Sequence, residues 1–130
     1  MHRTAIVYDF DGTLARGNIQ EHSLLPQLEV DKAAFWAEVK RLAQEHDADE
    51  ILIYMWRMLE AARAKSFAVT KDALRQHGAS TPLFKGVDTW FDRLSLYASE
   101  RNLHLDHYVI SSWNDQLIRS CSVARKFREV

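Results

Sequence analysis

The chain has 130 residues, of which 47% are hydrophobic and 27% are charged, and its net charge is −1. This composition is typical of globular proteins, and it lacks the basic field of a nucleic-acid-binding protein. No run of about 18 apolar residues is present, so no membrane span is expected. A single cysteine, Cys121, cannot form an internal disulfide, which predicts a cytoplasmic protein.

Near the N-terminus, the sequence predicts a buried strand that ends in two carboxylates. Residues 5–8 are apolar or aromatic, and Asp9 and Asp11 follow them directly. Such a short run is typical of a parallel sheet, in which ligands bind beyond the carboxyl ends of the strands. Gly12 then lets the chain turn. Two carboxylates at this spacing can flank one ligand, one as nucleophile and one as proton donor, and both suit Mg²⁺.

The same residue pattern also occurs in ordinary turns and at the start of calcium-binding loops. A calcium loop that began at Asp9 would need Glu at its twelfth position, where this chain has Gln20. The apolar strand before Asp9 therefore favours a catalytic site over a calcium loop.

Asp9-Phe10-Asp11-Gly12-Thr13-Leu14 after an apolar strand resembles the first motif of the haloacid dehalogenase superfamily, most of whose members are phosphohydrolases. The resemblance implies that Asp9 is the nucleophile and that Asp11 is the general acid/base. It also implies that Mg²⁺ is held by the Asp9 side chain and the Asp11 main-chain carbonyl. The fold implied is α/β, with a Rossmann-like parallel core.

Residues 17–85 predict a helical insertion between the first strand and the rest of the core. Asp31 and Thr70 occupy capping positions before two of its helices, and Gly78 is placed to end the last one. We expect its Trp and Met side chains to form the core of a small bundle rather than a ligand site; they are Trp36, Met55, Trp56 and Met58. The resemblance implies a cap that closes over the site and selects the substrate. The expected division is a core of residues 1–16 and 86–130 and a cap of residues 17–85.

A second short strand is predicted at residues 107–110, after a helix that Asp88 could cap. It ends at Ser111 and Ser112, whose hydroxyls can donate to phosphate oxygens or cap the next helix. The stretch resembles the superfamily's second motif, in which Ser or Thr binds phosphate; Ser111 is assigned this role and Ser112 is the near alternative. Relatives often have Gly where this chain has Trp113, whose ring could crowd the phosphate pocket or stack on a substrate.

Two further motifs of the superfamily, a lysine and an acidic pair, are absent after Ser112. Lys126 is the only lysine there, and its position in a helical stretch predicts a surface side chain. Residues 129–130 fall where a third strand should begin. The core is therefore expected to be incomplete, and the chain alone is expected to be weak or inactive and either to self-associate through its sheet or to be a piece of a longer protein.

The sequence thus predicts an incomplete Rossmann-like α/β core with an inserted all-helical cap. The expected function is Mg²⁺-dependent hydrolysis of a small phosphate ester through an aspartyl-phosphate on Asp9. The alternative is a truncated, non-catalytic fragment or binding remnant. A third possibility uses Asp9 for phosphoryl transfer or dehalogenation.

Overall fold

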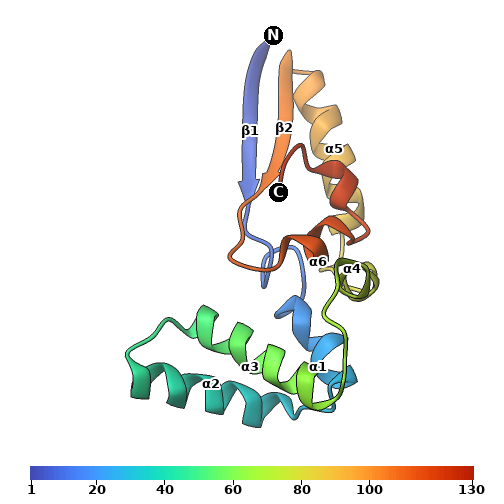
Figure 1. Cartoon of the computed structure of the whole chain (residues 1–130). Helices are drawn as coiled ribbons and strands as arrows, with labels where there is room; N and C mark the ends of the chain where they lie inside the picture. Colours follow the sequence, from blue (N-terminus) through green and yellow to red (C-terminus); the bar gives the residue numbers. More distant parts are fainter.

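The computed structural model describes residues 1–130 and consists of a two-stranded sheet with helices around it (Figure 1). The elements follow in the order β1 (His2–Tyr8), η1 (Ile19–Glu21), α1 (Leu24–Gln27), α2 (Lys32–His46), α3 (Glu50–Ala64), α4 (Lys71–Ala79), α5 (Val87–Ser99), β2 (Leu103–Val109), α6 (Asp115–Arg119) and η2 (Ala124–Lys126), where η is a 3-10 turn. The α2–α3 hairpin lies beyond the carboxyl ends of the strands, and α5 runs alongside the sheet (Figure 1). No helix has both the length and the apolar character that a membrane span requires.

The two strands run parallel, as predicted. Their register pairs His2 with Leu103 at one end and Tyr8 with Val109 at the other. Both strands begin earlier than their apolar runs predict, because the parallel ladder also takes in the polar residues that precede those runs. The pairing places the carboxyl ends of the strands side by side.

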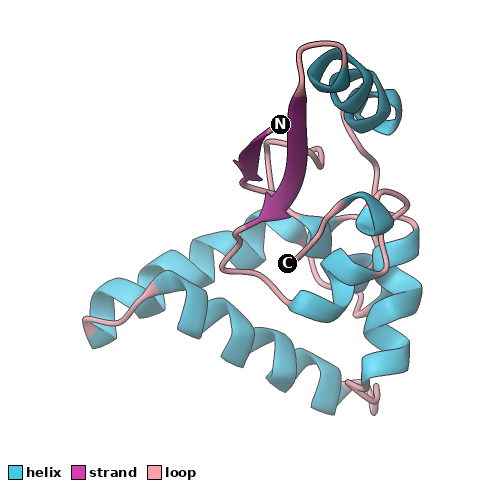
Figure 2. Cartoon of the chain, turned by 90° about the horizontal axis from the view of Figure 1, so that it is seen from above, coloured by secondary structure: helices cyan, strands magenta, loops and turns pink.

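The predicted Rossmann-like core is wrong. About half of the residues, 52%, are helical, and the sheet has only two strands, so the protein is a small α/β fold of another kind (Figure 2). Helices cover both faces of an all-parallel sheet in α/β proteins. Here α5 covers one face, while Val7 on the other face is 53% exposed. In place of a third strand, Glu129 forms one isolated parallel bridge with Tyr108.

Aromatic side chains attach α5 to the sheet. Phe91 of α5 is 1% exposed and packs edge to face against Tyr8 of β1, with ring centroids 5.6 Å apart. Phe127, near the C-terminus, packs edge to face on Phe91 as well, at 5.4 Å. These contacts place the carboxyl end of β1 and the C-terminal segment against one buried ring.

Side-chain caps determine where two of the longer helices begin. Asp31 before α2 and Thr70 before α4 each accept a hydrogen bond from the main-chain N–H three residues later, at 2.8 and 3.2 Å, as predicted. The start of α5 differs from the prediction. Gly86, with a φ of 90°, precedes the helix, and Asp88 lies in its first turn instead of capping it.

Helix α4 packs against α6 through Gly78 (Figure 1). The helix continues through Gly78 to Ala79, so the prediction that Gly78 ends it is wrong. A Cβ atom at position 78 would lie 2.1 Å from the main-chain oxygen of Leu117 and 2.0 Å from Ser120 Oγ. Glycine is therefore needed for close helix contact. This contact joins the helical insertion to the segment that follows β2.

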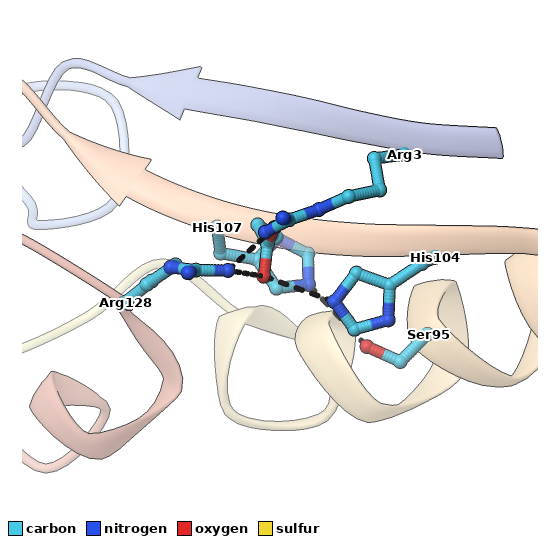
Figure 3. Close-up of polar contacts among 6 residues, drawn as sticks. Arg3, Ser95, His104, His107 and Arg128 are labelled. Atoms are coloured by element: carbon cyan, nitrogen blue, oxygen red, sulfur yellow. Dashed lines mark hydrogen bonds and ion pairs between the residues drawn. The ribbon is translucent and has the colours of Figure 1, made fainter.

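A charged cluster ties both strands to the C-terminal segment (Figure 3). Asp106 of β2 accepts hydrogen bonds from Arg3 of β1 at 3.1 Å and from Arg128 at 3.0 Å, and His104 lies 3.2 Å away. The hydrogen bond from Arg3, aided by Arg128 against the opposing effect of burial, lowers the pKa of Asp106 to about 2. The cluster depends on a charged Asp106 carboxylate.

We expect Gly78→Ala to destabilise the protein. Alanine favours a helix by about 1 kcal/mol over glycine, but the steric conflict with α6 costs about 1–3 kcal/mol. The net loss should lower the Tm by several degrees in thermal denaturation followed by circular dichroism. Gln76→Ala, at an exposed site on the same helix, is the matched control and should leave the Tm nearly unchanged. An unchanged or higher Tm for Gly78→Ala would show that α4 and α6 are not in close contact.

The Asp106 cluster should make stability depend on acid pH. Because the pKa of Asp106 is lower in the folded protein than in the unfolded chain, its contribution is complete above about pH 4 and is lost as the pH falls through about 2. The Tm difference between the wild type and Asp106→Asn should therefore be largest near neutral pH and shrink toward pH 2. Asp72→Asn, which removes a carboxylate from an exposed pair with Arg75, is the control. If the Tm difference between the wild type and Asp106→Asn does not change with pH, Asp106 does not cause the acid dependence of stability.

Candidate active site

The carboxyl ends of β1 and β2 open onto one cavity of about 580 Å³. The main-chain N–H of Ile110 donates to the carbonyl of Tyr8 at 2.9 Å, so the segments that follow the two strands start together. The cavity is lined by the four side chains that the sequence singled out, Asp9, Asp11, Ser111 and Ser112. The parallel pairing thus brings residues about 100 positions apart into one site.

Phe10, between the two acids, directs them toward the cavity. Its side chain is completely buried, so the residues on either side of it face the cavity. Its carbonyl accepts hydrogen bonds from the main-chain N–H groups of Leu14 and Ala15 at 2.9 and 3.1 Å, which holds the loop in a tight turn. Gly12 adopts a φ of 72°, a value that side chains disfavour, and so permits this turn.

The two carboxylates have different environments. Asp9 is exposed, and one of its oxygens accepts a hydrogen bond from Thr13 Oγ1 at 3.2 Å while the other has no protein partner. Asp11 is half-buried, and its Oδ1 accepts from the main-chain N–H of Ile19 at 3.0 Å. Burial raises the pKa of Asp11 to about 6, and the negative charges of Asp9 and Glu21 add to the shift against the hydrogen bond from Ile19. The site therefore holds an open carboxylate beside one that is readily protonated.

Neither serine caps the helix that follows. Asn114 is the N-cap of α6, where its side chain accepts from the main-chain N–H of Gln116 at 2.9 Å. Ser111 Oγ accepts a hydrogen bond from the N–H of Trp113 at 3.2 Å, and the Ser112 hydroxyl has no protein partner. Both hydroxyls keep a donor free for a ligand oxygen.

Helices α2 and α3 supply the opposite wall of the cavity. Trp36 and Lys40 come from α2, and Glu50, Ile51 and Tyr54 come from α3. Trp36, Met55 and Met58 pack against the core as expected, although Trp36 also lines the cavity, whereas Trp56 is 45% exposed and the expectation is wrong for it. The motifs gave no sign of these wall residues. The one available signal was helical spacing, because Trp36 and Lys40, like Glu50 and Tyr54, lie four residues apart and so share a helix face.

Glu21 joins the loop that follows Asp11 to α2. Its Oε1 accepts hydrogen bonds from Asn18 Nδ2 at 2.9 Å and Trp36 Nε1 at 2.7 Å, and its Oε2 lies 2.6 Å from Lys32 Nζ. Burial alone would raise the pKa of Glu21, but the hydrogen bonds from Lys32, Asn18 and Trp36 outweigh it and lower the pKa. Glu21 is therefore a charged, fully engaged anchor of the cavity wall.

Trp113 lies beside the cavity wall and not in the cavity itself. It is 9% exposed, and its ring lies 4.9 Å from that of Tyr54, which does line the cavity. It therefore neither crowds the space between the strand ends nor reaches a ligand there. Burial, with the nearby charge of Asp11, raises the pKa of Tyr54, so its hydroxyl stays neutral. The contact between the Trp113 and Tyr54 rings therefore supports α3 from outside the cavity.

The cavity has few positive charges. Its lining includes four carboxylates, those of Asp9, Asp11, Glu21 and Glu50, and a single cation, Lys40. Lys126 lies elsewhere, where its ammonium pairs with Asp92 of α5 at 2.5 Å. It is a surface residue, as predicted from its position in the sequence.

The residues at the strand ends offer a donor set that suits Mg²⁺. The main-chain carbonyl of Asp11 accepts no protein hydrogen bond, and one carboxylate oxygen of Asp9 is equally free. No group of three or more His, Cys, Asp or Glu side chains gathers here or elsewhere in the chain to form a complete metal cage. Mg²⁺ usually takes one or two carboxylates and fills its other positions with water and substrate phosphate, so two protein oxygens fit this ion.

No model of a known protein family matches the chain, and no solved structure matches it. The chain is similar to an uncharacterized protein of Borreliella burgdorferi, with 31% identity over 134 aligned positions that include 92% of this chain. The match covers 45% of that protein, so the chain spans less than half the length of this relative.

Asp11 should make the protein less stable at neutral pH than at acid pH. Because its pKa is higher in the folded protein than in the unfolded chain, its contribution to stability is complete below about pH 4 and is lost as the pH rises through about 6. Asp11→Asn removes this loss. It should stabilise the protein by about 1 kcal/mol at pH 7.5, after allowance for solvent screening, and by much less at pH 4.

Thermal denaturation at the two pH values measures this effect. Glu50→Gln removes an exposed carboxylate from the same cavity and is the matched control, for which we expect little change. Equal effects of Asp11→Asn at both pH values would mean that folding does not raise the pKa of Asp11.

Proposed function

We propose that this chain carries the nucleophile, the acid/base group and the phosphate-binding hydroxyls of a phosphate-monoester hydrolase of the haloacid dehalogenase type. The observation that carries the proposal is the single cavity lined by Asp9, Asp11, Ser111 and Ser112. The two acids follow one strand and the two serines follow its parallel neighbour, and the carboxyl ends of parallel strands are where α/β folds bind ligands.

Asp9 is the proposed nucleophile because its free carboxylate oxygen is exposed in the cavity. In the first step this oxygen forms a bond to phosphorus while the bond from phosphorus to the ester oxygen breaks. Thr13 holds the other oxygen and so limits rotation of the carboxylate. A water molecule then attacks the phosphorus of the aspartyl-phosphate, which releases phosphate and restores Asp9.

Asp11 is the proposed acid and base. With a pKa of about 6, a fraction of its carboxyl groups is protonated near neutral pH and can donate to the departing alcohol oxygen. The resulting carboxylate can then accept a proton from the attacking water. The N–H of Ile19 fixes Oδ1, which leaves Oδ2 for proton transfer.

Ser111 and Ser112 are proposed to donate hydrogen bonds to the phosphate oxygens. Ser112 has no protein partner, and Ser111 uses its oxygen only as an acceptor. The Asp9 carboxylate and the Asp11 carbonyl would hold Mg²⁺. When bound, the ion would offset the repulsion between the carboxylates and the phosphate.

A binding protein without turnover is the second candidate, because Lys40 is the single cation that the cavity lining offers to stabilise the charge of a phosphoryl-transfer transition state. Four carboxylates and one lysine repel a phosphate dianion unless a cation offsets them. For the same reason, we expect turnover by the 130-residue chain to be slow. The buried, unpaired Cys121 also supports a proposed cytoplasmic location.

Asp9→Asn should abolish hydrolysis of 4-nitrophenyl phosphate while leaving the fold intact. An amide is a poor nucleophile, and we expect the rate to fall by about 10³-fold or more, to the background level. Nitrophenolate release with Mg²⁺ measures the rate, and circular dichroism checks the fold. Asp31→Asn, a conservative change at the cap of α2, is the matched control.

A near wild-type rate for Asp9→Asn would remove Asp9 from the mechanism. No release of product by the wild type, together with binding of phosphate in the cavity, would favour the binding protein. Products other than phosphate and the alcohol would indicate phosphoryl transfer.

A further inference from the structure

Lys40 has no partner in the protein, unlike Glu21, the other charged residue that α2 and the η1 loop contribute to the cavity wall. It lies on α2, one turn after Trp36, on the face that lines the cavity. Its ammonium group forms no ion pair and no hydrogen bond with the protein, whereas Lys32 on the same helix is paired with Glu21 at 2.6 Å. Lys40 is thus an exposed cation with no internal partner in a cavity otherwise lined by acids.

Gln20 provides a second polar group without a partner. Its side chain is 2% exposed and lines the same cavity, and its amide forms no hydrogen bond with the protein. The buried atom without a partner is the acceptor Oε1, while Nε2 also forms no hydrogen bond with the protein and is a donor left free for a ligand oxygen.

We propose that Lys40 and Gln20 form a second half of the phosphate site, which binds the substrate's phosphate oxygens from the wall opposite Asp9. An ammonium group and an amide N–H are both donors, and hydrogen bonds from a cation to phosphate are among the strong ones in proteins. This inference rests on one part of the proposed function, namely that the ligand of this cavity is a phosphate.

The probe for this site is methylphosphonate, whose carbon–phosphorus bond is not hydrolysed. Binding is therefore measured without turnover, and the result is independent of whether Asp9 acts as a nucleophile. Trp36 is the reporter, because its indole lines the cavity four residues before Lys40. Its N–H resonance, assigned with Trp36→Phe, can be followed by NMR during titration of the full chain in the presence of Mg²⁺.

The expected result is saturable binding that depends on the charge at position 40. Lys40→Met should raise the Kd about tenfold or more, and Lys40→Arg should keep it within about threefold. Lys71→Met, at an exposed and unpaired lysine of α4, should leave the Kd unchanged. Gln20→Met should weaken binding less than Lys40→Met does.

Equal affinities of the wild type and Lys40→Met would overturn the proposal, as would the absence of saturable binding by the wild type. Because Gln20 is buried, Gln20→Met could fail to fold, and Lys40→Met then decides the question alone. Lys40-dependent binding without phosphatase activity would support this inference and refute the hydrolase. Hydrolysis by Asp9 with Lys40-independent binding would do the reverse.

Discussion

The pairing of β1 with β2 is the constraint on which the rest of the structure depends. Because the strands are parallel and their register matches Tyr8 with Val109, the loops after them leave from the same end of the sheet. The acids and the serines can meet only under this arrangement. An antiparallel pair would place them at opposite ends. The Asp106 cluster and the Phe91 ring both hold this pairing, since each joins a strand to a segment distant in sequence.

Electrostatics then determines what the cavity can bind. Lys32 neutralises Glu21, and a pKa of about 6 leaves most of Asp11 ionised at neutral pH, so the charges left to face a ligand are those of Asp9, Asp11, Glu50 and Lys40. A phosphate is attracted only if the cation and the hydroxyls outweigh these three acids. Because of this balance, we expect one exposed lysine on α2, Lys40, to have a larger effect on phosphate binding than its position in the sequence suggests.

The placement of the acids and serines at the ends of two parallel strands could be predicted from the sequence, but the architecture around them could not. An apolar run followed by Asp9 and Asp11 indicates a strand end with acids, and the caps at Asp31 and Thr70 follow from side-chain hydrogen bonding within one turn. The number of strands depends on which apolar segments pair with one another in the folded chain. Two apolar segments in the sequence do not show whether a third segment joins their sheet. Glycine occurs both at helix ends and where two helices pack closely, and only the tertiary structure distinguishes these roles. For this reason the sequence wrongly predicted a helix end at Gly78.

The most direct test of the account is to identify the side chain that becomes phosphorylated. The full chain would be mixed with Mg²⁺ and 4-nitrophenyl phosphate, quenched in acid and analysed by mass spectrometry of its peptides. The account predicts a phosphoryl group on Asp9 that hydroxylamine removes, because an acyl phosphate is labile to it whereas a serine phosphate survives. Phosphate on Ser111 or Ser112, or hydrolysis with no labelled peptide, would contradict it.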